Sequence, residues 1–308
     1  MADAALLKEP EADETGFVSR FVSAPDGLRL HVRIYGTRGR GLPIVCLPGL
    51  TRNGADFHEI ATALTADAAQ PRIVIAIDSR GRGRSDYDRD PENYSFPVEL
   101  ADVLTLITAL EIGPAIFLGT SRGGILTMLL GAARPTAIAG VILNDIGPVI
   151  DPKGLVRIKG YVGKMPTPRD FTEGAEILRR LGDAQFPNLP PEGWVRQARQ
   201  IWRQENGRFT LAYDPNLSKT LENVDVERPL PPLWAQFDSL ARVPLMVVHG
   251  GNSDILSAAT VDAVRGRRLD IDVLEVPDQG HAPLLAEPDP IARIAAFVTL
   301  CDVSTLGF

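Results

Sequence analysis

The sequence predicts an α/β fold, in which helices cover both faces of a mostly parallel sheet. Short apolar runs rich in β-branched residues alternate with segments whose apolar residues recur every three or four positions. The 308 residues, of which 44% are hydrophobic and 23% are charged, are enough for one large globular domain. The alternation stops between residues 150 and 232, which predicts an insertion into the pattern.

The first predicted element is an antiparallel hairpin, because residues 17–24 and 28–35 alternate apolar and polar side chains around a Pro-Asp-Gly turn. Helical spacing is clear over residues 98–110 and 125–133. Six nearly continuous apolar runs follow the hairpin, and we interpret them as buried parallel strands, which makes eight strands in all. These runs are residues 44–47, 73–77, 115–118, 141–143, 245–248 and 273–276.

Three regions are expected along the chain. Residues 1–16 carry five carboxylates and no long apolar run, so they are expected to form a flexible acidic tail. Residues 17–149 and 233–308 are predicted to form the sheet-and-helix core. Residues 150–232, helical and polar in pattern, are predicted to form a helical cap inserted after the sixth strand.

Composition excludes several classes of function. The net charge of -7, with no Lys/Arg cluster over an aromatic-rich stretch, argues against a nucleic-acid partner. No run approaches the roughly 18 apolar residues of a membrane span. Cys46 and Cys301 lie far apart, and the four histidines lack metal-ligand spacing, so neither a disulfide, a metal nor another cofactor is expected. We therefore expect a cytoplasmic protein that acts on a small molecule; the oligomeric state is not predicted.

One segment carries the chemistry of a nucleophile. Residues 115–124 read A-I-F-L-G-T-S-R-G-G, an apolar strand that runs through Gly119-x-Ser121-x-Gly123 into a helix. Small residues flank the serine because a strand-to-helix turn of this sharpness leaves no room for side chains. Such a turn exposes the serine hydroxyl at the edge of the sheet and directs the amides of the helix toward developing negative charge.

Three further segments accompany this turn in order. They are Leu47-Pro48-Gly49-Leu50, the motif D-S-R-G-R-G-R-S-D at residues 78–86, and Gly280-His281 after the last strand. Together with the serine turn, they make the chain resemble the α/β-hydrolase superfamily from about residue 28 to residue 300. The resemblance extends to the cap-bearing esterases and lactonases, including the enol-lactone and acetamidomethylene-succinate hydrolases. Pro48 departs from the family pattern, which usually has a histidine there.

The resemblance implies a role for each of four residues. Ser121 would be the nucleophile, and His281 would be its general base, which imidazole can be near neutral pH. The backbone amides of Leu50 and Arg122 would form the oxyanion hole.

Two aspartates are candidates for the acid of the catalytic triad. Asp254 follows the strand that most often bears the acid of the family, but alignment of Ile255-Leu256-Ser257 with the usual ending puts Ser253 at the position of the acid. Asp145 follows the preceding strand, which carries the acid in some branches. We favour Asp145, and both remain candidates.

A serine at this turn disfavours the dehalogenase and epoxide hydrolase branches, which carry aspartate there. The resemblance therefore implies cleavage of an ester, lactone or amide through an acyl-enzyme on Ser121. The alternatives are a carbon–carbon bond hydrolase of ring-cleavage products and a small-molecule receptor with a vestigial triad.

Arg52 and Arg122 could bind a substrate carboxylate by paired hydrogen bonds. Aromatic residues are candidates for the pocket wall, namely Trp194, Trp202, Phe209 and Trp234.

Overall fold

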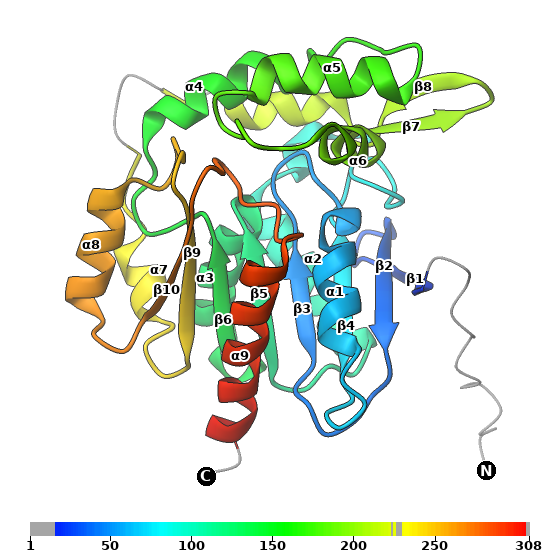
Figure 1. Ribbon diagram of the computed structural model, residues 1–308. Coiled ribbons are helices and arrows are strands. Elements are labelled where there is room, and N and C mark those ends of the chain that lie inside the picture. The colour runs from blue at the N-terminus through cyan, green and yellow to red at the C-terminus, as the bar shows by residue number, and fades with distance from the viewer. Residues whose placement is uncertain (1–15, 223, 226–229, 306–308) are drawn as a thin grey trace, which may run out of the picture.

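An eight-stranded sheet runs through the protein in the order β1-β2-β4-β3-β5-β6-β9-β10 (Figure 1). This computed structural model describes residues 16–222, 224–225 and 230–305, so the predicted acidic tail lies outside the described residues except for Gly16. Antiparallel pairing joins β1 to β2 and β2 to β4, and the other neighbours are parallel. The strands are β1 Val18–Ser23, β2 Arg29–Gly36, β3 Ile44–Leu47, β4 Ile73–Asp78, β5 Ala115–Thr120, β6 Ile138–Asn144, β9 Leu245–Gly250 and β10 Asp272–Val276.

Helices cover both faces of the sheet because successive strand residues point in opposite directions. In β3, Val45 packs into a cluster with residues of α2, α3, α7 and α8. Its neighbour Cys46 packs on the other face, against α1 and α9. The helices are α1 His58–Thr65, α2 Phe96–Ala109, α3 Arg122–Ala133, α7 Trp234–Asp238, α8 Ala258–Arg267 and α9 Pro288–Thr305, with short 3-10 turns at Gly54–Phe57, Pro91–Asn93 and Pro135–Ala137.

The segment between β6 and α7 lies over one edge of the sheet, at the top of Figure 1. It has a small apolar core of its own, built around Trp194 and Trp202. Its elements are α4 Pro152–Tyr161, α5 Phe171–Gly182, α6 Pro191–Ile201, β7 Trp202–Glu205, β8 Arg208–Leu211 and the 3-10 segment Pro215–Leu221.

This cap is not wholly helical, which corrects the expectation from the sequence. Strands β7 and β8 pair as an antiparallel hairpin across Asn206-Gly207, whose φ angles of 51° and 74° are both left-handed. An Asn-Gly pair favours this turn because both residues tolerate positive φ.

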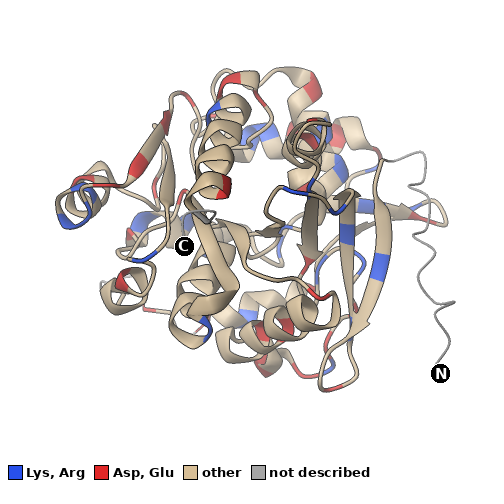
Figure 2. Ribbon diagram, turned by 90° about the horizontal axis from the view of Figure 1, so that it is seen from below, with Lys and Arg blue, Asp and Glu red and all other residues tan. Residues whose placement is uncertain are grey.

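Charged residues of both signs occur throughout the ribbon rather than separating onto two faces (Figure 2). Among the helices in the described part of the chain, none combines the length and the apolar character needed to cross a membrane.

Candidate active site

Ser121 stands at the sharp turn between β5 and α3, with φ 52° and ψ -115°. A residue other than glycine is strained in this backbone conformation, and such strain occurs mainly where function requires it. Side chains are excluded around the turn: a Cβ atom on Gly119 would lie 2.6 Å from the carbonyl oxygen of Gly123, and one on Gly123 would collide with Leu47 of β3. The glycines of the motif therefore allow the turn to pack directly on the sheet.

A chain of hydrogen bonds joins three of the predicted residues. The Ser121 Oγ lies 2.8 Å from Nε2 of His281, and Nδ1 of His281 lies 2.8 Å from Oδ2 of Asp145. Because an ionised carboxylate can only accept, Nδ1 carries the imidazole proton, and Nε2 accepts from the serine hydroxyl. The arrangement has the geometry required for a nucleophile, its base and an orienting acid.

Asp145 is held rigidly at the end of β6. Its side chain is fully buried, and it also accepts hydrogen bonds from the Gly250 amide at 2.8 Å and from the Ser253 hydroxyl at 2.5 Å. Ser253 is the residue that alignment puts at the usual position of the acid. Here its hydroxyl supports the carboxylate on the neighbouring strand instead.

Asp254 pairs with the cap and not with His281. Its carboxylate accepts two hydrogen bonds from Arg157 of α4, at 2.6 and 2.8 Å. Burial alone would raise the pKa of Asp254, but the bonds to Arg157 hold that pKa below its ordinary value. Of the two candidate acids, the structure brings only Asp145 to the histidine, and Asp254 ties the cap to the core.

The loop after β3 lies beside Ser121. A Cβ atom on Gly49 would be 3.7 Å from the Cβ of Ser121, and Leu50 lines the cavity above it. Arg122 is the first residue of α3, where a backbone N–H has no acceptor within the helix. The two predicted oxyanion-hole residues therefore flank the serine.

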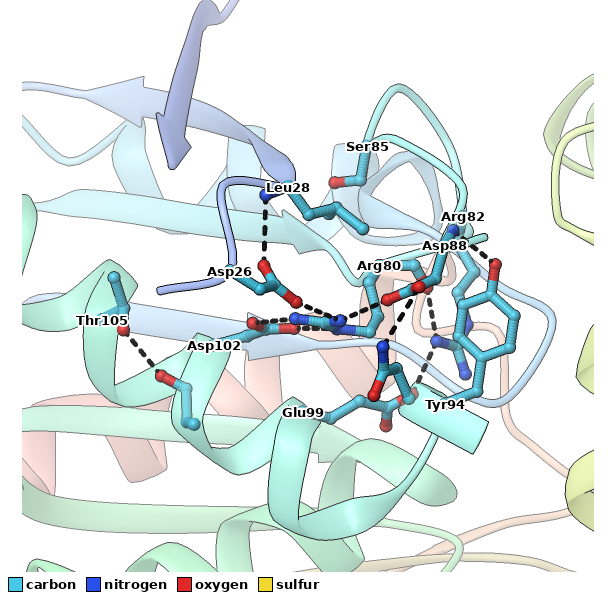
Figure 3. A network of polar contacts seen from close by, with 12 residues as sticks. Asp26, Leu28, Arg80, Arg82, Ser85, Asp88, Tyr94, Glu99, Asp102 and Thr105 are labelled. Carbon is cyan, nitrogen blue, oxygen red and sulfur yellow. Dashed lines mark hydrogen bonds and ion pairs between the residues drawn. The ribbon is translucent and has the colours of Figure 1, made fainter. Parts of the chain in front are cut away.

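A buried carboxylate connects these two loops. Glu99 of α2 accepts from Arg82 Nη1 at 2.6 Å (Figure 3). It also accepts from Arg122 Nε at 2.7 Å, and Arg82 Nε donates to the Leu50 carbonyl at 2.7 Å. Burial opposes ionisation of Glu99, but the two guanidinium groups hold its pKa below the ordinary value. Arg122 is thus committed to Glu99 and does not line the cavity.

The first arginine of the motif at residues 78–86 forms a second buried ionic cluster nearby. Arg80 is 1% exposed and pairs with Asp102 and Asp88 at 2.6 Å and with Asp26 at 2.9 Å (Figure 3). The motif is visible in the sequence, but Asp26 and Asp102 come from distant segments. No spacing in the sequence marks Glu99 as the residue that joins the two loops.

A cavity of about 450 Å³ opens above the serine, between the sheet and the cap. Ser121, His281 and Arg52 line it together with residues of α4, α5 and α6. Arg52 donates two hydrogen bonds to Asp56, at 2.6 and 2.8 Å. Among the described residues, His, Cys, Asp and Glu side chains form no group of three that could hold a metal ion.

The structure places three of the four predicted wall residues elsewhere, because Trp202 and Phe209 lie in the apolar core of the cap and Trp234 lies in α7. Trp202 is 1% exposed inside the apolar core of the cap, because β7 turns its side chain toward Phe209 and α5. Trp234 packs on Phe237 of α7 and beneath Arg267, away from the cavity. Of the four aromatic candidates, Trp194 is the one that lines the cavity.

Known proteins resemble this chain over nearly its whole length. The model of the alpha/beta hydrolase family matches residues 44–295. A 3-hydroxybutyrate-oligomer hydrolase from Cupriavidus necator is 33% identical over 284 residues, which cover 90% of this chain and 95% of that protein. A 2-(acetamidomethylene)succinate hydrolase from Mesorhizobium japonicum is 25% identical over 287 residues, covering 93% of this chain and 96% of that protein. The crystal structure of an alpha/beta hydrolase from Novosphingobium aromaticivorans matches with a TM-score of 0.83 and 38% identity, covering 92% of this chain and 98% of that one.

A sharply turned serine above a mostly parallel sheet, in a fold shared with these proteins, defines a class of hydrolytic enzymes. The chain belongs to the alpha/beta hydrolase family, and it is a hydrolase. The resemblance and the fold class inferred from the sequence are confirmed.

Proposed function

We propose that the protein is a serine hydrolase that cleaves carboxylic ester bonds of a small molecule through an acyl-enzyme on Ser121. The observation that carries this proposal is the hydrogen-bonded chain from Ser121 through His281 to the buried Asp145, which opens directly into a cavity. A cavity of about 450 Å³ is within the range of small-molecule sites.

In the acylation half-reaction, Ser121 Oγ attacks the ester carbon while its proton passes to Nε2 of His281. The carbonyl electron pair moves onto oxygen, and the amides of Leu50 and Arg122 donate to this oxyanion. In comparable enzymes, each such donor lowers the barrier by about 3 kcal/mol. When the oxyanion collapses, the alcohol leaves with the proton from the imidazolium. Asp145 stabilises that imidazolium and fixes its ring.

Deacylation repeats these steps with water as the nucleophile. His281 takes a proton from the water, hydroxide adds to the acyl carbon, and the Ser121 oxygen leaves with the proton that the histidine returns. The products are a carboxylic acid and the free enzyme, so the cycle consumes only water and ester.

The substrate class that we propose is short linear oligoesters of hydroxy acids, such as oligomers of 3-hydroxybutyrate. The support is the relative named for that activity, which is 33% identical and is matched over 95% of its length. Each repeat of such an oligomer has an apolar methyl-bearing backbone and one ester. The cavity wall suits it, because apolar groups such as Leu178, Phe186 and Ile201 line it beside a few polar ones.

Arg52 is the proposed contact for the free carboxylate at the end of such an oligomer. Its hydrogen bonds to Asp56, Gln197 and Gln200 use Nε and Nη2, so Nη1 is left to face a substrate. Arg52→Gln is expected to raise KM for a 3-hydroxybutyrate dimer and to leave KM for the methyl ester of that dimer much less affected. The two changes should differ by about tenfold, which corresponds to the loss of one charge-assisted hydrogen bond. Equal changes for the two substrates would remove Arg52 from carboxylate recognition.

Covalent labelling tests the mechanism. Treatment with a fluorophosphonate, followed by mass spectrometry, is expected to give one adduct per chain on Ser121. The adduct should be absent from Ser121→Ala, and its rate of formation should be much lower in His281→Ala. An adduct elsewhere, or labelling that ignores His281, would contradict the proposal.

A substrate panel tests the class of bond. We expect turnover of 3-hydroxybutyrate dimer and trimer and of p-nitrophenyl esters, all of it dependent on Ser121. Activity confined to diketone ring-cleavage products would show a carbon–carbon bond hydrolase. Thermal stabilisation by a ligand without any turnover would show a receptor.

A further inference from the structure

We propose that Gln185, a residue of the cap, is a positioning residue that holds His281 in place for catalysis. The proposal rests on the function proposed above, because it concerns the general base of that reaction. Gln185 belongs to the segment between α5 and α6, far from His281 in sequence, and nothing in its sequence neighbourhood marks it.

Both ends of the Gln185 amide are engaged by loops of the core. Its Oε1 accepts the backbone N–H of His281 at 2.9 Å, and its Nε2 donates to the carbonyl of Asn252 at 3.0 Å. Asn252 in turn donates through Nδ2 to the backbone carbonyl of Gln185 at 3.3 Å. One cap side chain therefore bridges the loop that carries the base and the loop that follows β9.

The loop that follows β9 also determines where the acid lies. Gly250 and Ser253, on either side of Asn252 in the sequence, donate the hydrogen bonds that hold Asp145. Gln185 thus connects the backbone of His281 to the loop whose residues hold Asp145. A change at this bridge alters the distance between His281 and Asp145 without removing either residue.

Two glycines make the close approach possible. A Cβ atom on Gly280 would collide with the Gln185 side chain, and a Cβ atom on Gly250 would lie 2.6 Å from the carbonyl of Gln279. The backbone immediately before His281 is therefore shaped to receive the glutamine on one side and the end of β9 on the other. The Gln185 side chain approaches this backbone closely, and both its Oε1 and its Nε2 are hydrogen-bonded. The loop that carries His281 is therefore restricted to a narrow range of positions.

The same cap segment borders the cavity. Gly182, Phe186 and Leu189 line it, whereas the Gln185 side chain faces the histidine loop. A substrate in the cavity would therefore pack against the segment that carries the bridge to His281.

Gln185→Met tests the proposal because methionine has nearly the same volume and cannot form either hydrogen bond. We expect kcat for a p-nitrophenyl ester to fall about 10- to 100-fold, the cost of a small misalignment of reacting groups, while KM changes much less. Gln185→Ala, which introduces no new contact, should show the same loss. Circular dichroism melts establish that each variant is folded.

A compact reagent separates positioning from substrate contact. Labelling of Ser121 by diisopropyl fluorophosphate requires His281 but little of the cap. We expect its rate to fall in Gln185→Met by about the same factor as kcat. Labelling at the rate of the unaltered protein, with only KM raised for larger esters, would show a binding role and overturn the proposal.

Asn188→Ala is the matched control. Asn188 lies in the same segment and bonds Asp278 of the same loop at 3.0 Å, but on the exposed surface and away from His281. Its loss should leave kcat unchanged. Wild-type kcat in both folded Gln185 variants would refute the positioning role alone, provided that Ser121→Ala abolishes turnover. Turnover that survives Ser121→Ala would instead refute the proposed function.

Discussion

Two Ser–His–Asp chains of hydrogen bonds occur among the residues that the structure describes. Besides the one at Ser121, the Ser19 hydroxyl lies 2.9 Å from Nε2 of His31, and Nδ1 of His31 lies 2.7 Å from Oδ2 of Asp78. The distances match those of the candidate triad within about 0.1 Å. Hydrogen bonding alone therefore does not identify the nucleophile.

The backbone distinguishes the two serines. Ser19 lies within the regular strand β1, where it has no helix N-terminus beside it, and its hydroxyl also accepts from Arg84 at 2.8 Å. Ser121 stands at a strained turn that opens into the cavity. A nucleophile needs space for the substrate and donors for the oxyanion; of these two serines, Ser121 is the one that lines the cavity and precedes a helix N-terminus.

Ser19→Ala should therefore leave the chemistry intact. We expect unchanged kcat and unchanged stoichiometry of fluorophosphonate labelling, with a loss of about 1 kcal/mol in the free energy of unfolding from the missing hydrogen bond. Urea titration and intact mass measure the two quantities. Loss of the label on removing Ser19 would mean that the wrong serine has been chosen.

The two aspartates make a second matched pair. Asp145→Asn should lower kcat by about 10⁴-fold, as in comparable triads, because the asparagine cannot stabilise the imidazolium and favours the wrong tautomer. Asp254→Asn should leave kcat within a few-fold, since this carboxylate bonds Arg157 and not the histidine. Steady-state kinetics of the two variants decide the assignment, and the reverse ranking would contradict it.

One carboxylate of helix α2 connects two loops that the proposed mechanism uses. Glu99 is 2% exposed and pairs with Arg122 and with Arg82, which bonds the Leu50 carbonyl. Removing one member of a buried ionic cluster leaves the other charges uncompensated, which costs far more than a surface ion pair contributes. We therefore expect this connection to stabilise the fold and to support the proposed oxyanion hole.

Glu99→Gln is expected to lower the free energy of unfolding by about 3 to 5 kcal/mol at neutral pH. Because the folded-state pKa of Glu99 is depressed, its contribution is complete above the ordinary carboxyl pKa of 4.5 and is lost as the pH falls through the folded-state value. The difference between wild type and variant should shrink correspondingly below pH 4.5 in urea titrations. A difference that stays constant with pH would exclude an ionic origin.

The β7–β8 hairpin of the cap depends on a left-handed glycine. Gly207 has φ +74° and nothing within 4 Å of the position of a Cβ atom, so Gly207→Ala adds backbone strain without a clash. We expect a loss of about 1 to 2 kcal/mol in unfolding free energy. Gly266→Ala in α8, also free of contacts but without positive φ, is the control and should stabilise by about 0.5 to 1 kcal/mol.

The parts of the fold that rest on short-range patterns were predictable. The eight core strands and the serine turn follow from apolar runs and one glycine motif, because buried strands and tight turns restrict composition locally. The hairpin at Asn206-Gly207 was missed although its turn pair is a recognised signal, since the surrounding strands are short and polar.

Contacts between residues that are distant in the sequence could not be predicted from the sequence. The choice between Asp145 and Asp254 depends on which carboxylate faces His281, and both follow strands that end at the same edge of the sheet. Gln185 and Glu99 are ordinary polar residues whose roles arise only from the placement of their partners. The packing of Trp202 into the core of the cap likewise depends on the hairpin that was not foreseen.

Polar contacts join the cap to the core near the cavity, beside an apolar cluster that includes Ile158, Val162 and Leu217 of the cap. Arg157 bonds Asp254, Arg196 bonds Glu59 at 3.1 Å, and Asn53 donates to the backbone carbonyl of Gln200 at 2.9 Å. The two ion pairs are partly exposed, and pairs of this kind contribute modestly and are weakened by salt. We therefore expect the cap to loosen at these pairs before the core unfolds.

Arg157→Gln is the variant that tests this expectation. It removes the ion pair between α4 and Asp254, whose two side chains are 29% and 22% exposed, so the loss is limited to about 0.5 to 1 kcal/mol. Amide hydrogen exchange measured by mass spectrometry should accelerate about two- to fivefold in α4 and stay unchanged in β5.

Because Arg157 depresses the pKa of Asp254, this anchoring is complete above the ordinary aspartate pKa of 3.8 and is lost as the pH falls through the folded-state value. Added salt should accelerate exchange of α4 in the wild type more than in the variant; equal acceleration in both would show that apolar packing, and not the ion pair, holds the cap.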